Sequence, residues 1–270
     1  MTPPPDHISY LQQYVYAGSG IVLDTEKQYL MEARLAPILR ERGLASLSEL
    51  CQVLRSTKSS PLHAQVVEAM TTNETYFFRE PAHYDALRKT ILPELMAMRS
   101  GTRKLTCWSA AASTGQEAYS LAMMLLEMGV DGWNIDILGT DLSSRVLGQA
   151  ESGRYSQLEV NRGLPVALLL KYFRRVGLEW ELKEEVRRMA HFRSFDLRAG
   201  MQSLGPFDVV FCRNVLIYFD VEAKRRILEE IHGTLFRGGY LLLGGSETTL
   251  NLTTRFERRI LGQTVLYQAP

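Results

Sequence analysis

The chain has 270 residues, and its 31 lysines and arginines nearly balance its 30 aspartates and glutamates, giving a formal net charge of +1. Because 46% of the residues are hydrophobic, the chain can fill a core, which argues against disorder. The near-neutral charge argues against a protein built mainly to coat nucleic acid, for which a strong basic excess is expected. No stretch approaches the roughly 20 consecutive apolar residues of a membrane span.

The three cysteines, Cys51, Cys107 and Cys212, are widely spaced and form no CxxC pair. This pattern argues against a zinc ribbon and against a disulfide framework. The N-terminal residues MTPPPDHISY have neither the basic segment nor the apolar stretch of an export signal. We therefore expect a cytoplasmic protein that holds no metal ion.

The first 80 residues have the spacing of helices and contain no strand-like run. Amphipathic stretches cover Glu26–Arg42, Leu47–Leu54 and Leu62–Met70. Arg34 falls inside the apolar arc of the first stretch, which is unusual for a cation. We expect either a packed stem whose head pairs with a carboxylate, or a residue that recognises an anion.

After about Leu105 the pattern changes to strands that alternate with helices. Strands are predicted at Leu105–Ser109, Asn134–Gly139, Phe207–Cys212, Tyr240–Leu243 and Thr264–Gln268, and helices at Glu117–Met128, Ser144–Ser152 and Glu222–Phe236. This alternation predicts a parallel sheet covered by helices. The last two strands have no helix between them, so we expect an antiparallel hairpin at the sheet edge.

Between Gly153 and Asp196 the alternation is interrupted. Pro165–Tyr172 has a helical pattern, whereas Trp180–Leu182 and Val186–Phe195 are short, charged, strand-like runs. The region is either a solvated connection plus the next sheet strand, or a small β-rich insertion with its own binding surface. The domain boundary is expected between Arg79 and Arg103, where a helix links the two halves.

The loop Ser109–Gly115 (SAAASTG) follows one predicted strand and precedes a helix. Its small side chains would let a ligand approach the backbone at the carboxyl end of a parallel strand. A dinucleotide needs several closely spaced glycines here, so an NAD-dependent dehydrogenase is disfavoured and a ligand without phosphates fits better. Small residues also occur where a strand and a helix simply pack tightly.

Two acidic residues follow this loop. Asp141 ends the next predicted strand, where an acidic residue commonly accepts hydrogen bonds from ribose hydroxyls, although it could also cap the following helix. Glu117 lies in the first turn of a helix, where a carboxylate stabilises the helix dipole and could also accept from a ligand ammonium. The loop and the acids together suggest a cofactor that carries a nucleoside.

The segment Phe207–Tyr218 (FDVVFCRNVLIY) is a buried strand that ends abruptly in Arg213-Asn214. Polar groups at the carboxyl end of a central strand lie where ligands bind in α/β sheets. Tyr218 could present its hydroxyl to such a site, or pack with its hydroxyl satisfied elsewhere.

The segment Thr71–Pro81 (TTNETYFFREP) is densely polar and aromatic, yet it precedes the predicted sheet. It is either a helix N-terminal cap anchored in a core by Phe77 and Phe78, or a lid that donates polar side chains to a cofactor cleft.

Taken in order, these motifs resemble the CheR family of chemotaxis receptor methyltransferases. The resemblance rests on TTNETYFFRE, WSAAASTGQEAYSLAM, GTDLSSRVL, FDVVFCRNVLIYFD and the tail GGSETTL with LGQTVLYQ. It covers nearly the whole chain, and so many motifs in the same order are highly specific.

The resemblance implies an α/β fold, in which a Rossmann-like sheet that binds S-adenosylmethionine (SAM) follows a small N-terminal all-α domain and carries a small antiparallel β-subdomain insertion. The implied domains are a receptor-docking domain (1–80), a linker helix (81–102) and a methyltransferase domain (103–270) with an insertion at about 172–192. The implied activity is methyl transfer to glutamate side chains on the cytoplasmic helical bundle of methyl-accepting chemoreceptors. The products would be γ-methyl esters and S-adenosylhomocysteine (SAH).

Matching the motifs residue by residue implies which side chains meet the cofactor. The implied cofactor contacts are Asn73, Thr75, Arg79, Glu117, Asp141, Asp196, Leu197, Cys212, Arg213 and Asn214. Glu117 would contact the methionyl part, Asp141 the ribose, and Asp196 with Leu197 the adenine. Arg79, Arg213 and Tyr218 would lie nearest to the transferred methyl group as catalytic residues. The family often reads GEE where this chain has Gly115-Gln116-Glu117, and Glu117 is the residue carried over.

Substrate docking is predicted from charge and loop length. The docking cations for an acidic receptor bundle would be Lys27, Arg34, Arg40 and Arg42. Family members that grip a receptor's C-terminal pentapeptide tend to have a long, Gly-rich loop in the β-subdomain, whereas this chain has a short link at Val176-Gly177. We therefore predict an enzyme that needs no such tether. We also expect it to act as a monomer, to bind no nucleic acid and not to insert into a membrane.

Two alternatives stay open from the sequence. One is a SAM-dependent methyltransferase of another substrate, which would not obviously need the N-terminal helices. The other is a non-catalytic, SAM-sensing signalling module, against which the intact Arg79, Glu117, Asp141 and Tyr218 speak.

Overall fold

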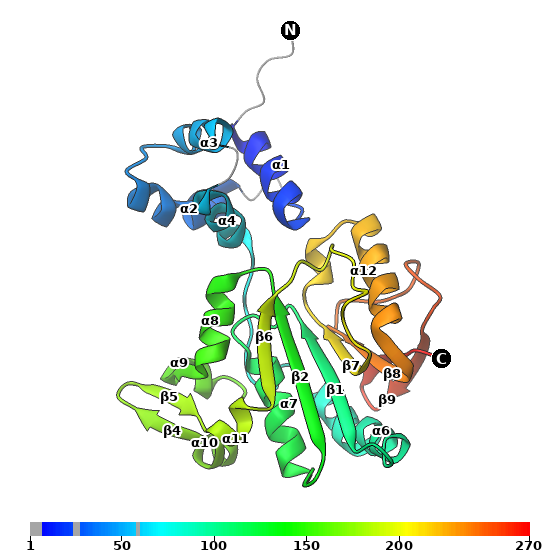
Figure 1. Cartoon of the computed structure of the whole chain (residues 1–270). Coiled ribbons are helices and arrows are strands. Elements are labelled where there is room, and N and C mark those ends of the chain that lie inside the picture. Colours follow the sequence, from blue (N-terminus) through cyan, green and yellow to red (C-terminus); the bar gives the residue numbers. More distant parts are fainter. Residues whose placement is uncertain (1–6, 24–27, 58–59) are drawn as a thin grey trace. The chain divides into compact units, whose positions relative to one another are not determined.

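The structure is a computed structural model that describes residues 7–23, 28–57 and 60–270 (Figure 1). It divides into two compact units. The smaller unit contains the chain up to Thr72 together with Tyr218–Ala223, and the larger unit contains Asn73–Ile217 and Lys224–Pro270. The polar and aromatic segment that follows Thr72 therefore belongs to the larger unit.

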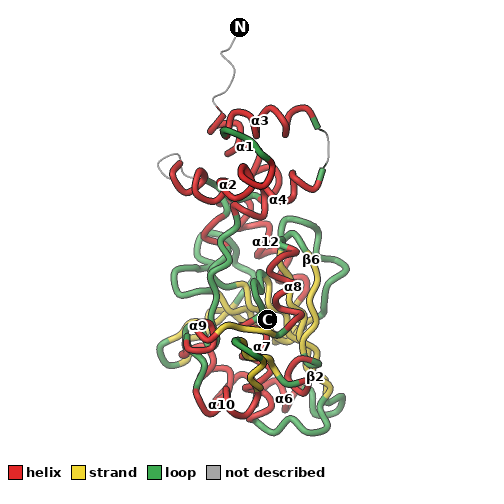
Figure 2. The backbone as a smooth tube through the Cα atoms, turned by 90° about the vertical axis from the view of Figure 1, so that its left-hand side faces the viewer, coloured by secondary structure: helices red, strands yellow, loops and turns green. Residues whose placement is uncertain are grey.

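The described part of the smaller unit consists of helices and loops, in agreement with the prediction for this region (Figure 2). Its complete helices are α1 (His7–Ser19), α2 (Gln28–Arg42), α3 (Leu47–Ser56) and α4 (Pro61–Met70). They bury Leu11, Leu35, Leu50 and Val66 completely in one apolar cluster. None of the described helices of the chain is both long enough and apolar enough to cross a membrane.

The larger unit is built on a seven-stranded sheet in the order β6-β2-β1-β7-β8-β10-β9. The strands are β1 (Lys104–Ala110), β2 (Asn134–Asp141), β6 (Ala190–Ser194), β7 (Phe207–Cys212), β8 (Leu235–Leu243), β9 (Glu257–Leu261) and β10 (Thr264–Gln268). The pairs from β6 to β8 are parallel, and β10 is antiparallel to both β8 and β9. The predicted antiparallel pairing of Tyr240–Leu243 with Thr264–Gln268 is confirmed, but the expected hairpin at the sheet edge was wrong, because β9 lies between the two strands in sequence and forms the edge beside β10. The prediction missed β9 because its ERRIL sequence is largely exposed and has no apolar run.

The predicted helices of the sheet domain are confirmed. Helices α7 (Gln116–Glu127) and α8 (Ser144–Ser152) pack against β1, β2 and β6, and α12 (Val221–Thr234) lies beside β7 and β8 (Figure 1). The helix expected to link the two halves runs without a break through α5 (Pro81–Ala86), a π-helical turn η2 (Leu87–Ile91) and α6 (Leu92–Met98). Its apolar side chains join the main core of the larger unit, so it is part of that unit's packing.

The interruption between β2 and β6 contains both a small sheet and the next main-sheet strand. Its elements are β3 (Arg154–Ser156), α9 (Gln157–Asn161), α10 (Val166–Tyr172), β4 (Phe173–Val176), β5 (Glu179–Leu182) and α11 (Glu184–Arg187). The small sheet is antiparallel in the order β3-β5-β4. The range of about 172–192 missed β3, which is too short for a periodic pattern, and it overlaps the start of β6, which pairs with β2. The predicted strand-like run Val186–Phe195 is not a strand throughout, because its first two residues are the end of α11 and only Ala190–Ser194 forms a strand.

Burial explains why the central elements could be predicted. Every residue of β7 is buried, and so are Leu105–Ala110 of β1, as expected for strands covered on both faces. Gly139 of β2 lies opposite Phe192 of β6, and a Cβ at Gly139 would approach the Phe192 ring to 2.3 Å. Glycine at this position therefore allows β6 to pair beside the carboxyl end of β2, where the candidate site lies.

Candidate functional site

The loop after β1 has an unusual backbone. Ala111, Ser113 and Gly115 all have positive φ angles, of 63°, 50° and 89°. The Ala112 amide donates to the Thr140 carbonyl at 2.8 Å, and the Ser113 hydroxyl donates to the Asn73 carbonyl at 2.8 Å. Non-glycine residues in this region of φ need support from their surroundings. Hydrogen bonds to β2 and to the segment after Thr72 therefore hold the loop in this conformation at the carboxyl edge of the sheet.

Asp141 ties this loop to the end of β2. One oxygen of its carboxylate accepts from the Ser113 amide at 2.9 Å, and the other accepts from the Ser143 amide at 3.0 Å. The side chain is largely buried, with 7% of the residue exposed. The sequence left open whether Asp141 caps a helix or meets a ligand, and these contacts show that it bridges the loops after β1 and β2.

Glu117 projects from the first turn of α7 toward the same edge. Its Oε1 accepts from the Ser109 hydroxyl at 2.7 Å, and its Oε2 accepts from Arg213 Nη1 at 2.8 Å. Strand β1, helix α7 and the end of β7 thus meet at one carboxylate. Each oxygen retains a lone pair, so Glu117 can accept a further hydrogen bond from a ligand.

Arg213 is buried, with only 1% of its side chain exposed. Besides Glu117, its guanidinium pairs with Glu80 at 3.2 Å and donates to the Arg79 carbonyl at 2.5 Å. These partners orient all three groups around one fixed cation. The geometry makes Arg213 a residue that positions Glu117 and the Arg79 backbone.

Glu80 is a functional candidate that the sequence reasoning missed. It lies before α5 in a left-handed conformation, with φ of 59°. Its carboxylate meets Arg213, His83 at 3.2 Å, the Asn214 side-chain amide at 3.3 Å and the Gly245 amide at 3.4 Å. Burial disfavours the charged form, but these donors and the Arg213 charge outweigh it and hold the pKa of Glu80 well below its usual range.

Acid should therefore lower the free energy of unfolding of the protein, in part by protonating Glu80. A carboxyl group with a depressed folded pKa stabilises above its unfolded pKa of about 4.3, and this contribution is lost as the pH falls further. Between about pH 4.3 and 3.3, we expect the free energy of unfolding of wild type to fall by about 1 kcal/mol more than that of Glu80→Gln. Urea unfolding at both pH values measures this difference. The control is Glu185→Gln, which changes an exposed glutamate and should lose stability with pH as wild type does. If the free energy of unfolding fell equally between the two pH values for wild type and Glu80→Gln, the depressed pKa of Glu80 would be contradicted.

The segment Asn73–Glu80 has no regular secondary structure before α5. Phe77 is fully buried, edge-on to Tyr155 and Phe173, so the predicted core anchor is confirmed. Arg79 is half-buried, donates to the Glu74 carbonyl at 2.9 Å and lies 5.6 Å from the centre of the Tyr76 ring. Thr75 lies on the same half-buried stretch.

The remaining predicted cofactor residues follow β6 and β7. Arg198 holds the carboxylate of Asp196 through its guanidinium and its backbone amide, and the neighbouring Leu197 is buried. Cys212 ends β7 fully buried, and burial raises the pKa of its thiol, so it stays neutral. Asn214 follows with a φ of 57° and donates its side-chain amide to Glu80. The larger unit thus brings Glu117, Asp141, Asp196, Leu197, Cys212, Arg213 and Asn214 to the carboxyl ends of β1, β2, β6 and β7. The segment that carries Asn73, Thr75 and Arg79 is attached there through the carbonyls of Asn73 and Arg79, while the Arg79 guanidinium bonds the Glu74 carbonyl instead.

Five predicted residues fall outside this group. Tyr218 belongs to the smaller unit, where its side chain packs against the helical core and its carbonyl accepts from the Val22 amide at 2.9 Å. Lys27 lies outside the described residues, whereas Arg40 and Arg42 are exposed at the end of α2, with Arg42 bonded to Gln65.

For Arg34, the expected carboxylate partner was wrong. Its guanidinium donates to the carbonyls of Met70 and Thr71, at 2.8 and 3.2 Å, and to the Thr72 hydroxyl at 2.9 Å. The carbonyls at the end of a helix carry partial negative charge, so those of Met70 and Thr71 suit a cation without an acidic residue.

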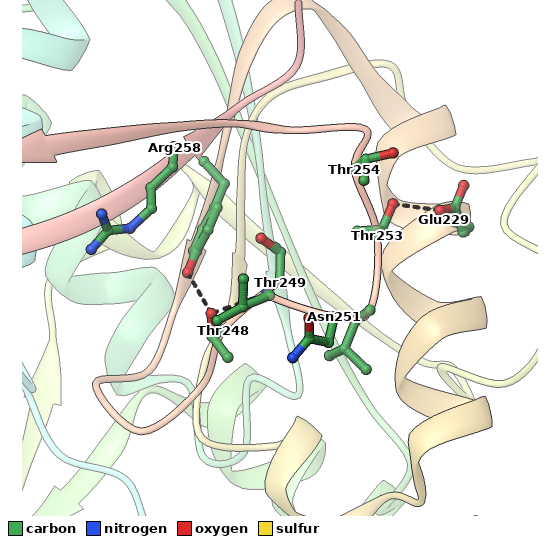
Figure 3. A pocket seen from close by; sticks show the side chains of 10 residues that line it. Glu229, Thr248, Thr249, Asn251, Thr253, Thr254 and Arg258 are labelled. Atoms are coloured by element: carbon green, nitrogen blue, oxygen red, sulfur yellow. Dashed lines mark hydrogen bonds between the residues drawn. The ribbon is translucent and has the colours of Figure 1, made fainter.

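Two pockets that no predicted site residue lines are formed partly by the loop after β8. One has a volume of about 420 Å³ and includes Glu80, Gly244, Glu247 and Arg258. The other, of about 810 Å³, is formed by the threonine-rich loop Thr248–Thr254 together with Glu229, Arg258 and Tyr267 (Figure 3). Exposed loops of this kind carry no periodic pattern, so neither pocket could be predicted beyond the resemblance of GGSETTL.

Comparison with known proteins identifies both parts of the chain. Residues 73–264 match the family model described as CheR methyltransferase, SAM binding domain, and residues 6–71 match the one described as CheR methyltransferase, all-alpha domain. Chemotaxis protein methyltransferase 1 of Pseudomonas aeruginosa is 43% identical over 93% of this chain and 93% of its own length. Chemotaxis protein methyltransferase Cher2 of Pseudomonas putida is 41% identical over 95% of each chain. These matches confirm the resemblance seen in the sequence.

Proposed function

This chain belongs to the CheR methyltransferase family and is a SAM-dependent methyltransferase, and we propose that its acceptors are glutamate side chains of a chemoreceptor. The observation that supports the acceptor is the similarity to chemotaxis protein methyltransferases over more than nine-tenths of the chain. The cofactor part is supported by the pair of carboxylates, Glu117 and Asp141, on either side of a loop of small residues at the carboxyl edge of a parallel sheet. The cofactor of such a reaction is SAM, and the product is SAH.

The residues present fit this cofactor. The loop Ala110–Gly115 has no side chain larger than threonine and approaches β2 through backbone hydrogen bonds, which leaves room for a nucleoside. Glu117 is proposed to accept from the methionyl ammonium, and Asp141 from the ribose hydroxyls. Asn73, Thr75, Asp196, Leu197, Cys212 and Asn214 are proposed to line the same cofactor. When bound, SAM supplies a methyl group on a sulfonium sulfur, which departs as a neutral thioether when an acceptor oxygen bonds to the methyl carbon.

The chemistry asks little of a general base. A free glutamate has a pKa near 4.3, so an acceptor carboxylate is already ionised at pH 7. What the protein must supply is alignment and exclusion of water around a weak nucleophile. We assign positioning of the acceptor or the cofactor to Arg79 and Tyr218. Arg213 is proposed to act one step behind them, since its guanidinium is already occupied by Glu117, Glu80 and the Arg79 carbonyl.

We propose that the smaller unit docks an acidic helical bundle of the receptor in the cytoplasm, with the enzyme as a monomer. Exposed Arg40 and Arg42 support this role, whereas the head of Arg34 is already hydrogen-bonded to carbonyls. The turn from β4 to β5 contains only Gly177 and Leu178, which supports an enzyme without a pentapeptide tether. Calorimetry with a receptor-tail pentapeptide tests this point, and micromolar binding would contradict it.

Radiolabelled methyl transfer to membranes that contain receptors is the test of the proposed function. We expect labelled receptor that releases methanol in alkali, as a glutamate ester does, and incorporation that falls with added salt because docking is electrostatic. Label that is stable in alkali would point to another acceptor. Binding of SAH with no transfer would point to a sensing module, and transfer unaffected by salt would contradict electrostatic docking.

Arg79→Ala tests the positioning role directly. Loss of one charged positioning contact is worth on the order of 2–3 kcal/mol, so we expect receptor methylation to fall about 30–150-fold. Arg88→Ala, which changes an exposed arginine of η2 paired with Asp85, is the control and should methylate like wild type. Full turnover and unchanged SAH affinity in Arg79→Ala would remove Arg79 from the site.

A further inference from the structure

The carboxylate of Glu247 accepts hydrogen bonds from backbone amides of two loops, and one of these amides belongs to the proposed cofactor residue Asn214. Its Oε2 accepts from Asn214 and from Gly244, both at 2.7 Å, and its Oε1 accepts from Val215 at 2.9 Å and from Ile217 at 3.3 Å. Three of these donors follow β7 and one follows β8. A single side chain therefore connects the ends of two neighbouring parallel strands.

The approach of the two loops is close. The turn after β8 is closed by a hydrogen bond from the Glu247 amide to the Gly244 carbonyl at 2.9 Å. A Cβ at Gly244 would lie 2.5 Å from the Asn214 side-chain nitrogen, so only glycine fits there. Asn214 itself has a φ of 57°, a conformation that a non-glycine residue keeps only when its surroundings hold it. The amides bound to Glu247 on either side of this strained residue, at Asn214 and Val215, provide that support.

The strained turn determines where Arg213 and Asn214 point. Arg213 immediately precedes the residues whose amides Glu247 binds, and its side chain reaches Glu117 and Glu80. Asn214 donates its side chain to Glu80. A shift of this backbone would displace the cation that orients Glu117, although Glu247 touches neither Glu117 nor Arg213 directly.

We propose that Glu247 is a positioning residue for cofactor binding, because it locks the turn after β7 onto the turn after β8 and so fixes Arg213, Asn214 and, through Arg213, Glu117. The inference rests on the cofactor contacts proposed above for Glu117, Arg213 and Asn214. A carboxylate is needed for this role because it offers two acceptor oxygens and no donor. A glutamine would turn an NH₂ group toward one pair of these amides, leaving two N–H donors unpaired.

The test compares Glu247→Gln with Glu229→Gln. Glu229 is a carboxylate of α12 that accepts from the Thr253 hydroxyl (Figure 3). It also pairs with Arg255, and neither partner is one of the proposed cofactor residues. Titration calorimetry with SAH at 25 °C is expected to give at least tenfold weaker binding for Glu247→Gln, since hydrogen bonds to a charged group are lost, and binding within twofold of wild type for Glu229→Gln.

Hydrogen–deuterium exchange separates positioning from general stability. In Glu247→Gln we expect peptides that cover residues 213–217 and 244–247 to exchange at least tenfold faster, while peptides from β1 and β2 keep wild-type protection. Saturating SAH should restore much of the lost protection, because the ligand then holds the turn in its bound conformation.

Two results would overturn the inference. One is SAH affinity in Glu247→Gln within twofold of wild type, and the other is faster exchange spread evenly over the whole larger unit, which would indicate a purely structural role. Neither readout uses the methyl acceptor. If receptors were not methylated at glutamate while the SAH dependence on Glu247 held, the proposed acceptor alone would be wrong.

Discussion

Arg213→Met is expected to lower the free energy of unfolding by about 3 kcal/mol, because it removes a buried cation and leaves its acceptors behind. Glu117 and Glu80, with 14% and 27% of their side chains exposed, would lose their ion pair, and the Arg79 carbonyl would lose its donor. Since Arg213 also orients Glu117, SAH binding should weaken by more than tenfold. Urea unfolding and calorimetry measure the two effects.

The control for this variant is Arg255→Met. Arg255 pairs with Glu229 at 2.9 Å, but the side chains are 59% and 38% exposed, so water replaces much of what the pair provides. A change of less than about 1 kcal/mol is expected there. If Arg213→Met were as mild as the control, the buried network would not be the element that holds this edge of the sheet together.

Asp141→Ala is expected to weaken SAH binding about 100-fold and to cost about 2 kcal/mol of stability, because it removes a largely buried acceptor of two backbone amides. The Ser113 and Ser143 amides, which it binds at 2.9 and 3.0 Å, would be left without this partner. The loop after β1 would lose its attachment to β2, and the proposed acceptor for the ribose hydroxyls would disappear. Calorimetry with SAH and urea unfolding are again the measurements.

Asp136→Ala is the matched control, since Asp136 lies on the same strand nearer its amino end. It is about half exposed and meets His191 at 3.1 Å, away from the loop after β1. We expect its SAH affinity to match that of wild type. Asp141→Asn should fall between, because its side chain keeps one acceptor oxygen. Affinity of Asp141→Ala within threefold of wild type would remove Asp141 from the cofactor site.

Much of the fold could be predicted because its central strands and helices have recognisable local sequence patterns. The continuous apolar run of β7, and the alternation of strands with helices from β1 onward, reflect burial on both faces of a parallel sheet. Once that alternation is recognised, Glu117 and Asp141 follow, since neighbouring parallel strands end at the same edge. The short or exposed strands β3 and β9 escaped because neither contains a buried apolar run.

Beyond Glu117, Asp141 and the Arg213-Asn214 pair, the site was predictable only where the motifs resembled a family. Glu80 and Glu247 were missed because a glutamate in a loop looks like any solvated charge until its donors are known. Arg34 shows the same limit from the other side. Its place in an apolar arc indicated that its head needed a partner, but the partner proved to be the carbonyls at the end of α4.

The near-neutral charge is a count of residues, so the sequence alone determined it. The sequence alone also determined the helical first region and the strand–helix alternation, because both depend on burial patterns within a few turns or strands of the chain. The tertiary structure decided which charges meet. Arg213 and Glu117 are 96 positions apart, and Asn214 and Glu247 are 33 apart, yet each pair lies within 2.8 Å. Such contacts depend on how strands are ordered in a sheet and how their loops turn, and no local pattern of residues encodes those distances.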